Sequence, residues 1–138
     1  GDLAVDAHHT VEDIGLCLGQ ALDQALAGRR AIRRYGCACI PMDDALSRVA
    51  VDLGGRPFLA YRIANRCRKI NNFDVGLIEE FLRAFCVQAR MNLHIEQYYG
   101  KDAHHAFESV FKALARALRE AMALDRREKD FPSSKGIL

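Results

Sequence analysis

The sequence predicts a protein of mixed helices and strands in which one structural unit occurs twice. The segments Asp6–Glu12 and Asp102–Glu108 carry the same motif, Asp-Ala-His-His-x-x-Glu. Each copy begins an amphipathic helical segment and follows a short strand-like segment that contains a leucine. A repeated unit of this kind indicates duplication, so two similar half-domains are expected.

Helical segments are expected where apolar residues recur at a spacing of three or four. The first runs from Asp6 to Ala27 and stops at Gly28, a residue type that is common just after helix ends. The second runs from Asp74 to Arg90. The third, Asp102–Leu124, carries one apolar stripe opposite a basic face.

Strand-like segments fill much of the region between the first two helices, and one more precedes the third helix. Gly54 and Gly55 predict a hairpin turn between the two strands that flank them. A polar link follows from Asn65 to Asn72, and the tail from Asp125 onward is polar. The expected strands are residues 2–5, 35–42, 46–53, 57–63 and 91–97.

The charge balance gives no reason to expect nucleic acid or an anionic membrane as a partner, because 20 Lys and Arg face 18 Asp and Glu for a net charge of +2. No apolar run approaches the length of a membrane span. The number of cysteines is odd, and no Cys-x-x-Cys pair occurs. Free, mostly buried thiols in a reducing cytoplasm are therefore expected.

The histidines are concentrated in the repeat. Four of the five histidines lie in the two motif copies, and the fifth, His94, lies on the strand just before the second copy. Histidine together with a carboxylate is a common ligand set for zinc, manganese and iron. The repeat therefore predicts a metal site.

Helix geometry divides these ligands. Residues four apart share a face, so His8 lies beside Glu12 in the first copy, and the first histidine of the second copy lies beside Glu108. The neighbouring histidine is turned by roughly 100° and points elsewhere. We expect each His–Glu pair to bind one metal while the odd histidine, His9 or His105, completes a different one, an exchange that can cross between subunits. Aspartates at the N-cap, Asp6 and Asp102, are expected to fix both helix starts.

These residues resemble a known family. The runs Val5–Gly15 and Gly100–Lys112 are similar to the two signatures of imidazoleglycerol-phosphate dehydratase, and the similarity extends in order over essentially the whole chain. Supporting matches are Arg33–Gly36, Asp43–Arg48, Gly55–Pro57, Asn92–Ile95 and Pro132–Gly136.

The resemblance implies an α+β fold of duplicated half-domains, each a mostly antiparallel sheet packed on helices, similar to domain 2 of ribosomal protein S5. The half-domains would be residues 1–63 and 64–138, the second ending in a phosphate-binding tail. The resemblance further implies a hollow homo-oligomer of about 24 subunits with active sites between subunits. Neither nucleic acid nor a membrane is implied as a partner.

The implied activity is that of a lyase in histidine biosynthesis, which dehydrates D-erythro-imidazole glycerol phosphate to imidazole acetol phosphate with two Mn²⁺ ions per active site. Glu108 is the preferred proton shuttle, with Glu12 and Asp43 as further candidates. By resemblance, Arg34, Arg56, Ser133 and Lys135 bind the phosphate. The expected metal ligands are His8, His9, Glu12, His94, His104, His105 and Glu108.

Two other functions share the same ligands. Family members carry an additional N-terminal part with a Phe-Leu-Asp-His pattern that this sequence lacks, so a truncated, non-catalytic metal-binding assembly subunit is the main alternative. Such a subunit need not keep the phosphate-binding residues, and their presence favours the enzyme. A metal-dependent hydrolase would use the same ligands to activate water.

Overall fold

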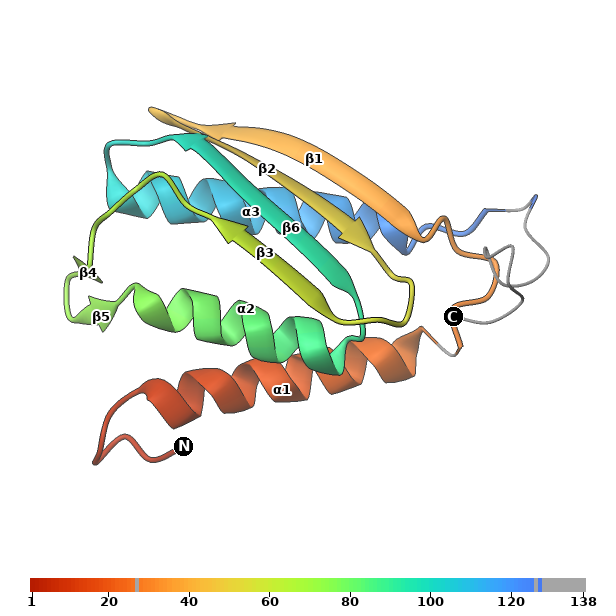
Figure 1. Ribbon diagram of the computed structural model, residues 1–138, viewed down its shortest axis with the longest axis horizontal. Helices are drawn as coiled ribbons and strands as arrows, with labels where there is room; N and C mark the ends of the chain where they lie inside the picture. Colours follow the sequence, from red (N-terminus) through yellow and green to blue (C-terminus); the bar gives the residue numbers. More distant parts are fainter. Residues whose placement is uncertain (27, 126, 128–138) are drawn as a thin grey trace.

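The computed structural model describes residues 1–26, 28–125 and 127, and within them it has the predicted α+β character (Figure 1). The helices are α1 (His8–Ala25), α2 (Gly76–Gln88) and α3 (Ala103–Ala121). The strands are β1 (Tyr35–Met42), β2 (Ala45–Asp52), β3 (Phe58–Arg62), β4 (Lys69–Ile70), β5 (Phe73–Asp74) and β6 (Asn92–Tyr99).

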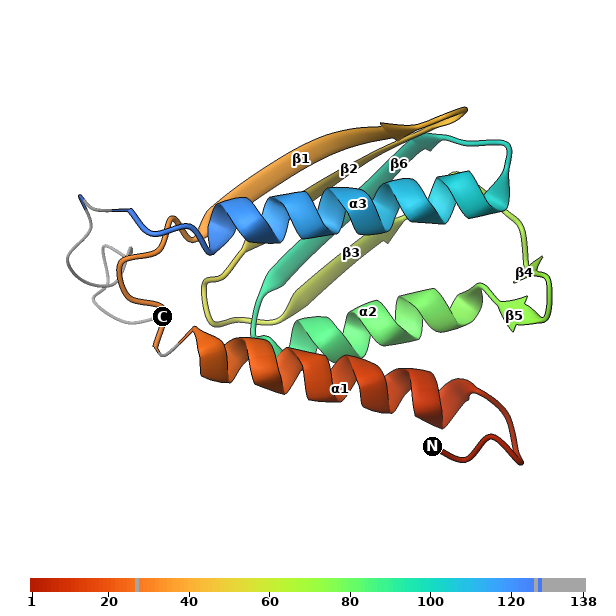
Figure 2. The same ribbon diagram turned by 180° about the vertical axis from the view of Figure 1, so that it is seen from behind.

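The main sheet has the strand order β1-β2-β6-β3. Its first two pairings are antiparallel, and β3 runs parallel to β6. Figure 2 shows α3 lying across the back of this sheet, with α2 beside it and α1 packed on the outside of α2. The two helices nearest the sheet meet at Phe81 of α2 and Phe111 of α3, whose rings are 6.0 Å apart.

Alternation of side chains along β2 and helical spacing along α3 create the core between the sheet and α3. Ser47, Val49 and Val51 of β2 point toward α3 and are almost completely buried. Val49 pairs with Ile95 of β6, so apolar side chains of adjacent strands lie on the same face. On α3, the buried residues of this core include Ser109, Val110, Ala113, Ala117 and Ala121.

The segment before α1 differs from its prediction. Residues 2–5 form a turn, in which the amide of Val5 donates to the carbonyl oxygen of Asp2 at 3.0 Å. Leu3 and Val5 are 71% and 72% exposed, because no described strand lies beside them. The expected strand at this position is therefore wrong.

The expected hairpin at Gly54 and Gly55 is also wrong, because β6 lies between β2 and β3. The residues of a turn do not show that a strand much later in the sequence pairs between the two strands that flank the turn. The tight hairpin is instead at Asp43 and Asp44, between β1 and β2, where Asp43 has a positive φ of 44°. The polar link Asn65–Asn72 contains β4, which pairs with β5.

One sheet takes strands from both sides of residue 63, and the division into half-domains 1–63 and 64–138 stays a prediction. The thiols are free, but the expectation that most are buried is wrong, since Cys86 alone is buried and the other four are exposed. Within the described ranges, no helix combines the length and apolar character needed to cross a bilayer.

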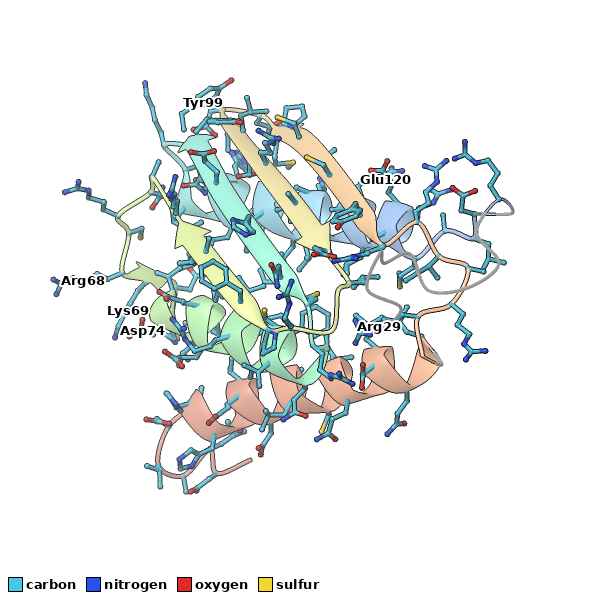
Figure 3. All side chains as sticks on the ribbon, turned by 45° about the vertical axis from the view of Figure 1, so that its right-hand side comes forward. Arg29, Arg68, Lys69, Asp74, Tyr99 and Glu120 are labelled. Carbon is cyan, nitrogen blue, oxygen red and sulfur yellow. The ribbon has the colours of Figure 1, made fainter. Side chains whose placement is uncertain are left out.

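A buried arginine joins α1 to the rest of the fold (Figure 3). Arg29 is 3% exposed and donates to the carbonyl oxygens of Leu53 at 3.1 Å and Ala89 at 2.8 Å. Its guanidinium also pairs with Asp23 of α1. A buried cation needs such partners, so Arg29 fixes the end of α1 against the ends of β2 and α2.

The α1–α2 contact depends on a close backbone approach. A Cβ added at Gly15 would lie 2.6 Å from the carbonyl oxygen of Phe81 and 3.0 Å from the Cβ of Ala84. Because backbone atoms of α2 occupy that space, a side chain there would push the helices apart. The approach therefore holds the His-His start of α1 at a fixed place.

We predict that Gly15→Ala lowers the free energy of unfolding by about 1–3 kcal/mol, because overpacking outweighs the better helix propensity of alanine. Urea unfolding measures the change. The control is Gly76→Ala at the exposed first residue of α2, where the added Cβ would meet only the Asp74 side chain at 3.2 Å. Equal effects of the two variants would contradict the packing argument.

Candidate active site

The start of α3 carries the second motif in the predicted arrangement. Asp102 caps the helix, since its side chain accepts a hydrogen bond from the amide of His105 at 3.0 Å. One turn along, Nε2 of His104 lies 3.1 Å from Oε2 of Glu108. The expected pairing of this histidine with this glutamate on one helix face is therefore present in the structure.

The start of α1 carries the first motif with weaker support. Ala7 occupies the N-cap, and the Asp6 carboxylate accepts the amide of His8 at 2.8 Å instead, so the N-cap predicted for Asp6 is wrong by one position. Nε2 of His8 lies 3.9 Å from Oε2 of Glu12. His9 points away from this pair, and its Nδ1 lies 3.4 Å from a carboxylate oxygen of Asp2.

His105 contacts the β1–β2 turn rather than Glu108. Its Nδ1 lies 2.8 Å from Oδ1 of Asp44, and its Nε2 lies 3.4 Å from Oδ2 of Asp43. The hydrogen bond to Asp44 raises the pKa of His105. The same bond, together with backbone amides of Asp102 and Lys101, lowers the pKa of Asp44 to about 2. Asp44 was not among the predicted site residues, because only the fold brings it to the motif.

Glu108 has a second partner that the sequence analysis also missed. Nζ of Lys112 lies 2.7 Å from Oε1 of Glu108, and this hydrogen bond lowers the pKa of the glutamate. The spacing of four residues along a helix could have revealed the pair. The first motif has Leu16 at the equivalent position, so the two glutamates differ in their surroundings.

Buried polar groups fix the first turn of α3 to the sheet. The hydroxyls of Ser47 on β2 and Ser109 on α3 are 2.6 Å apart, and neither side chain is exposed. Ser109 donates to the carbonyl oxygen of Ala106 at 2.7 Å, and the Gln97 amide of β6 donates to the same oxygen at 3.0 Å. These hydrogen bonds hold the start of α3, which carries the second motif, against β2 and β6 of the sheet.

Two of the predicted phosphate ligands, Arg34 and Arg56, lie just before β1 and between β2 and β3. These ends of the strands lie at the opposite end of the sheet from the starts of α1 and α3 (Figures 1 and 2). Arg34 precedes β1, whereas Asp43, beside His105, follows it. Eight residues of extended strand span about 25 Å. Within the described residues, a single chain therefore does not bring Arg34 or Arg56 close to the second motif.

Arg34 is held in place by a carboxylate. Its Nε and a terminal nitrogen donate to the two oxygens of Asp52 at 2.6 and 3.1 Å, and these bonds raise the pKa of the guanidinium. Arg56 lies exposed in the loop between β2 and β3. Ser133 and Lys135 lie outside the described residues.

His94 faces the open side of the sheet, away from α3. Its ring lies 5.5 Å from the ring of Phe58, in a hollow that Arg48, Arg62 and Glu96 also line. The buried neighbours Leu93 and Ile95 point to the opposite face. Within one chain, His94 is therefore separated from both His-His motifs by the sheet.

The donors fit a transition metal in type but not in number within one chain. Each motif supplies an imidazole nitrogen and a carboxylate oxygen on one helix face, the ligand types that Mn²⁺ and similar ions accept. In the described part of the chain, no three His, Cys, Asp or Glu side chains are placed to hold a metal ion. The two pairs are therefore suited to be parts of a larger ligand set.

Comparison with known proteins gives the family. The sequence model of imidazoleglycerol-phosphate dehydratase matches residues 1–118. The chain belongs to the imidazoleglycerol-phosphate dehydratase family. A dehydratase of this name from Bacillus licheniformis is 53% identical over 138 residues, which are the whole of this chain and 71% of that protein. One from Methylorubrum extorquens is 54% identical with the same coverage.

Solved structures agree with this membership in the imidazoleglycerol-phosphate dehydratase family. The enzyme from Staphylococcus aureus superposes with a TM-score of 0.84 at 42% identity, covering 87% of this chain and 70% of that one. The enzyme from Pyrococcus furiosus gives a TM-score of 0.82 at 40% identity, covering 95% and 71%. The protein is thus a hydro-lyase of histidine biosynthesis, as the resemblance implied.

We predict that Ser109→Ala lowers the free energy of unfolding by about 1–2 kcal/mol, because it leaves the buried hydroxyl of Ser47 without its partner. The double variant Ser47→Ala/Ser109→Ala should cost less than the two single changes together. Urea unfolding of all four proteins gives the coupling. Strict additivity would show that the hydroxyls do not stabilise each other.

Proposed function

We propose that this dehydratase acts on D-erythro-imidazole glycerol phosphate at a site with two manganese ions that bind the imidazole ring, and releases imidazole acetol phosphate. The observation that carries the proposal is the pairing of an imidazole with a carboxylate at the starts of two helices. The paired nitrogen and oxygen atoms are 3.1 Å apart in α3 and 3.9 Å apart in α1. Both starts lie at the same end of the molecule (Figure 1).

The two motifs would hold the metals in the manner expected from helix geometry. His104 with Glu108 would bind one ion, and His8 with Glu12 would bind the other. His9, His94 and His105 would complete the ligand sets, with contributions from neighbouring subunits. The bound ions would supply Lewis acidity at the ring nitrogens of the substrate.

The chain's own carboxylates would move the proton. The reaction takes a hydrogen from carbon, expels the neighbouring hydroxyl as water, and leaves an enol that becomes the ketone. Glu108 is the first candidate for the base, because its carboxylate lies at the second motif, 3.1 Å from Nε2 of His104. Glu12 remains a second candidate, and Asp43 a third because it lies beside Nε2 of His105.

The phosphate would be bound by Arg34, Arg56, Ser133 and Lys135. A substrate of this size is about 10 Å long, too short to span the length of β1, about 25 Å. Sites between subunits of a homo-oligomer resolve this mismatch, because one subunit can supply the motifs and another the arginines. An assembly of about 24 subunits and a cytoplasmic location, which free thiols favour, belong to the same proposal.

We predict that His104→Ala weakens Mn²⁺ binding by at least about 10–100-fold and abolishes dehydration, because it removes one donor of a pair. Metal content after dialysis and formation of the ketone product are the measurements. Arg116→Ala, a change of an exposed cation farther along α3, should leave both unchanged. Full metal content in His104→Ala would contradict the assigned ligand.

We predict that subunits with His104→Ala and subunits with Arg56→Ala are each inactive alone, but regain activity when unfolded and refolded together. If each site takes the motif from one subunit and the arginine from another, random mixing of equal amounts restores about a quarter of the sites. Each variant refolded alone is the control.

Absence of any recovery in mixed oligomers would place all these residues in one chain's site and contradict the shared arrangement. If the unmodified protein binds Mn²⁺ but forms no ketone, the function is that of a non-catalytic metal-binding assembly subunit instead. If chelation of the metal leaves dehydration unchanged, the manganese proposal is wrong.

A further inference from the structure

We propose that Asp44 is a positioning residue that fixes the tautomer of His105, so that Nε2 of this ring is the nitrogen available to a metal ion. The inference rests on the proposed function, in which His105 is a metal ligand. Asp44 itself would not touch the metal; it would act through the ring.

The two carboxylate oxygens of Asp44 have separate partners. Oδ2 accepts the backbone amides of Lys101 at 2.8 Å and Asp102 at 3.0 Å. Oδ1 lies 2.8 Å from Nδ1 of His105. An ionised carboxylate only accepts hydrogen bonds, so Nδ1 must carry the hydrogen. In the neutral ring Nε2 then has the free lone pair.

This arrangement is the one that metal-binding histidines need. A ligating imidazole commonly donates its other N–H to a carboxylate, which sets the tautomer and the ring orientation. The Nε2 side of His105 faces Asp43, whose side chain is 68% exposed. A metal ion at Nε2 would therefore lie on the solvent-facing side of the ring.

The fold leaves Asp44 little freedom. The β1–β2 turn is tight, with Met42 paired directly with Ala45. Asp102 caps the amide of His105, so the histidine is held at its backbone by one aspartate and at its ring by another. Among the described residues the first motif lacks this arrangement, since the carboxylate beside the His9 ring is that of Asp2, at 3.4 Å.

The substitution Asp44→Asn separates two roles of this side chain, accepting the backbone amides and setting the tautomer of His105. An asparagine that keeps its oxygen at the Oδ2 position still accepts the two backbone amides. Its NH₂ group then faces Nδ1 and donates to it, which forces the hydrogen onto Nε2 and blocks metal binding. The opposite rotamer would set NH₂ against two N–H donors and is disfavoured.

The experiment compares wild type, Asp44→Asn and Asp74→Asn, each selectively labelled with ¹⁵N-histidine. Asp74 likewise accepts a backbone amide at the start of a helix, that of Gly76 at 2.9 Å, which makes it a matched control that contacts no described histidine. Nitrogen chemical shifts of the metal-free, neutral ring report the tautomer, Mn²⁺ titration reports affinity, and thermal unfolding reports stability.

We expect His105 to carry its hydrogen on Nδ1 in wild type and Asp74→Asn, and on Nε2 in Asp44→Asn. The affinity of one Mn²⁺ site should fall about 10–100-fold in Asp44→Asn alone, with folding retained. A wild-type ring protonated on Nε2 overturns the inference even if the variant fails to fold. So does unchanged affinity in a folded Asp44→Asn protein.

A fourth protein, His105→Ala, separates this inference from the function on which it rests. If His105→Ala loses metal while Asp44→Asn keeps the wild-type tautomer and affinity, the positioning role alone is wrong. If His105→Ala keeps both metal ions, His105 is not a ligand, and the proposed metal site fails together with the role of Asp44.

Discussion

The structure depends on the packing of α3 across the sheet. Small and branched side chains of α3 lie against the alternating core residues of β2, and both sets are buried almost completely. This packing brings the first turn of the helix to the β1–β2 turn. Asp44 can contact His105 and the backbone amides of Lys101 and Asp102 only because the β1–β2 turn and the start of α3 lie side by side. The geometry of the second motif is thus a result of core packing.

Local sequence signals predicted most elements and failed where partners are distant. The periodicity of α3 and the alternation of β2 are properties of the segments themselves, so their bounds agree within a few residues. The hairpin predicted at Gly54 and Gly55 is wrong because β2 and β3 each pair with β6, which lies between them. The strand expected at residues 2–5 failed because a strand needs a partner, and none of the described segments provides one. A strand is stabilised by its contacts with a neighbouring strand, and its own residue pattern does not show whether such a neighbour exists.

The same distinction applies to the candidate site. Spacing of four residues along a helix predicted the His–Glu pairs, and the structure contains them. The contact between Asp44 and His105 joins residues far apart in the sequence, so no local rule could predict it. The predicted strand 35–42 separates Arg34 from Asp43, but only the fold shows that Asp43 lies beside the second motif. The distance along this strand supports the proposal that each site is built by several subunits.

The central position of β6 has a consequence for synthesis of the chain. β6 pairs with β2 on one side and with β3 on the other, yet it follows β3 by about 30 residues. At translation rates of about 5–20 residues per second, β2 and β3 are synthesised a few seconds before β6. During this time the backbone groups on the edges that face β6 lack their hydrogen-bond partners. Exposed edges of this kind attract other strands. Until β6 has emerged, the nascent chain therefore carries two strand edges without their native partner.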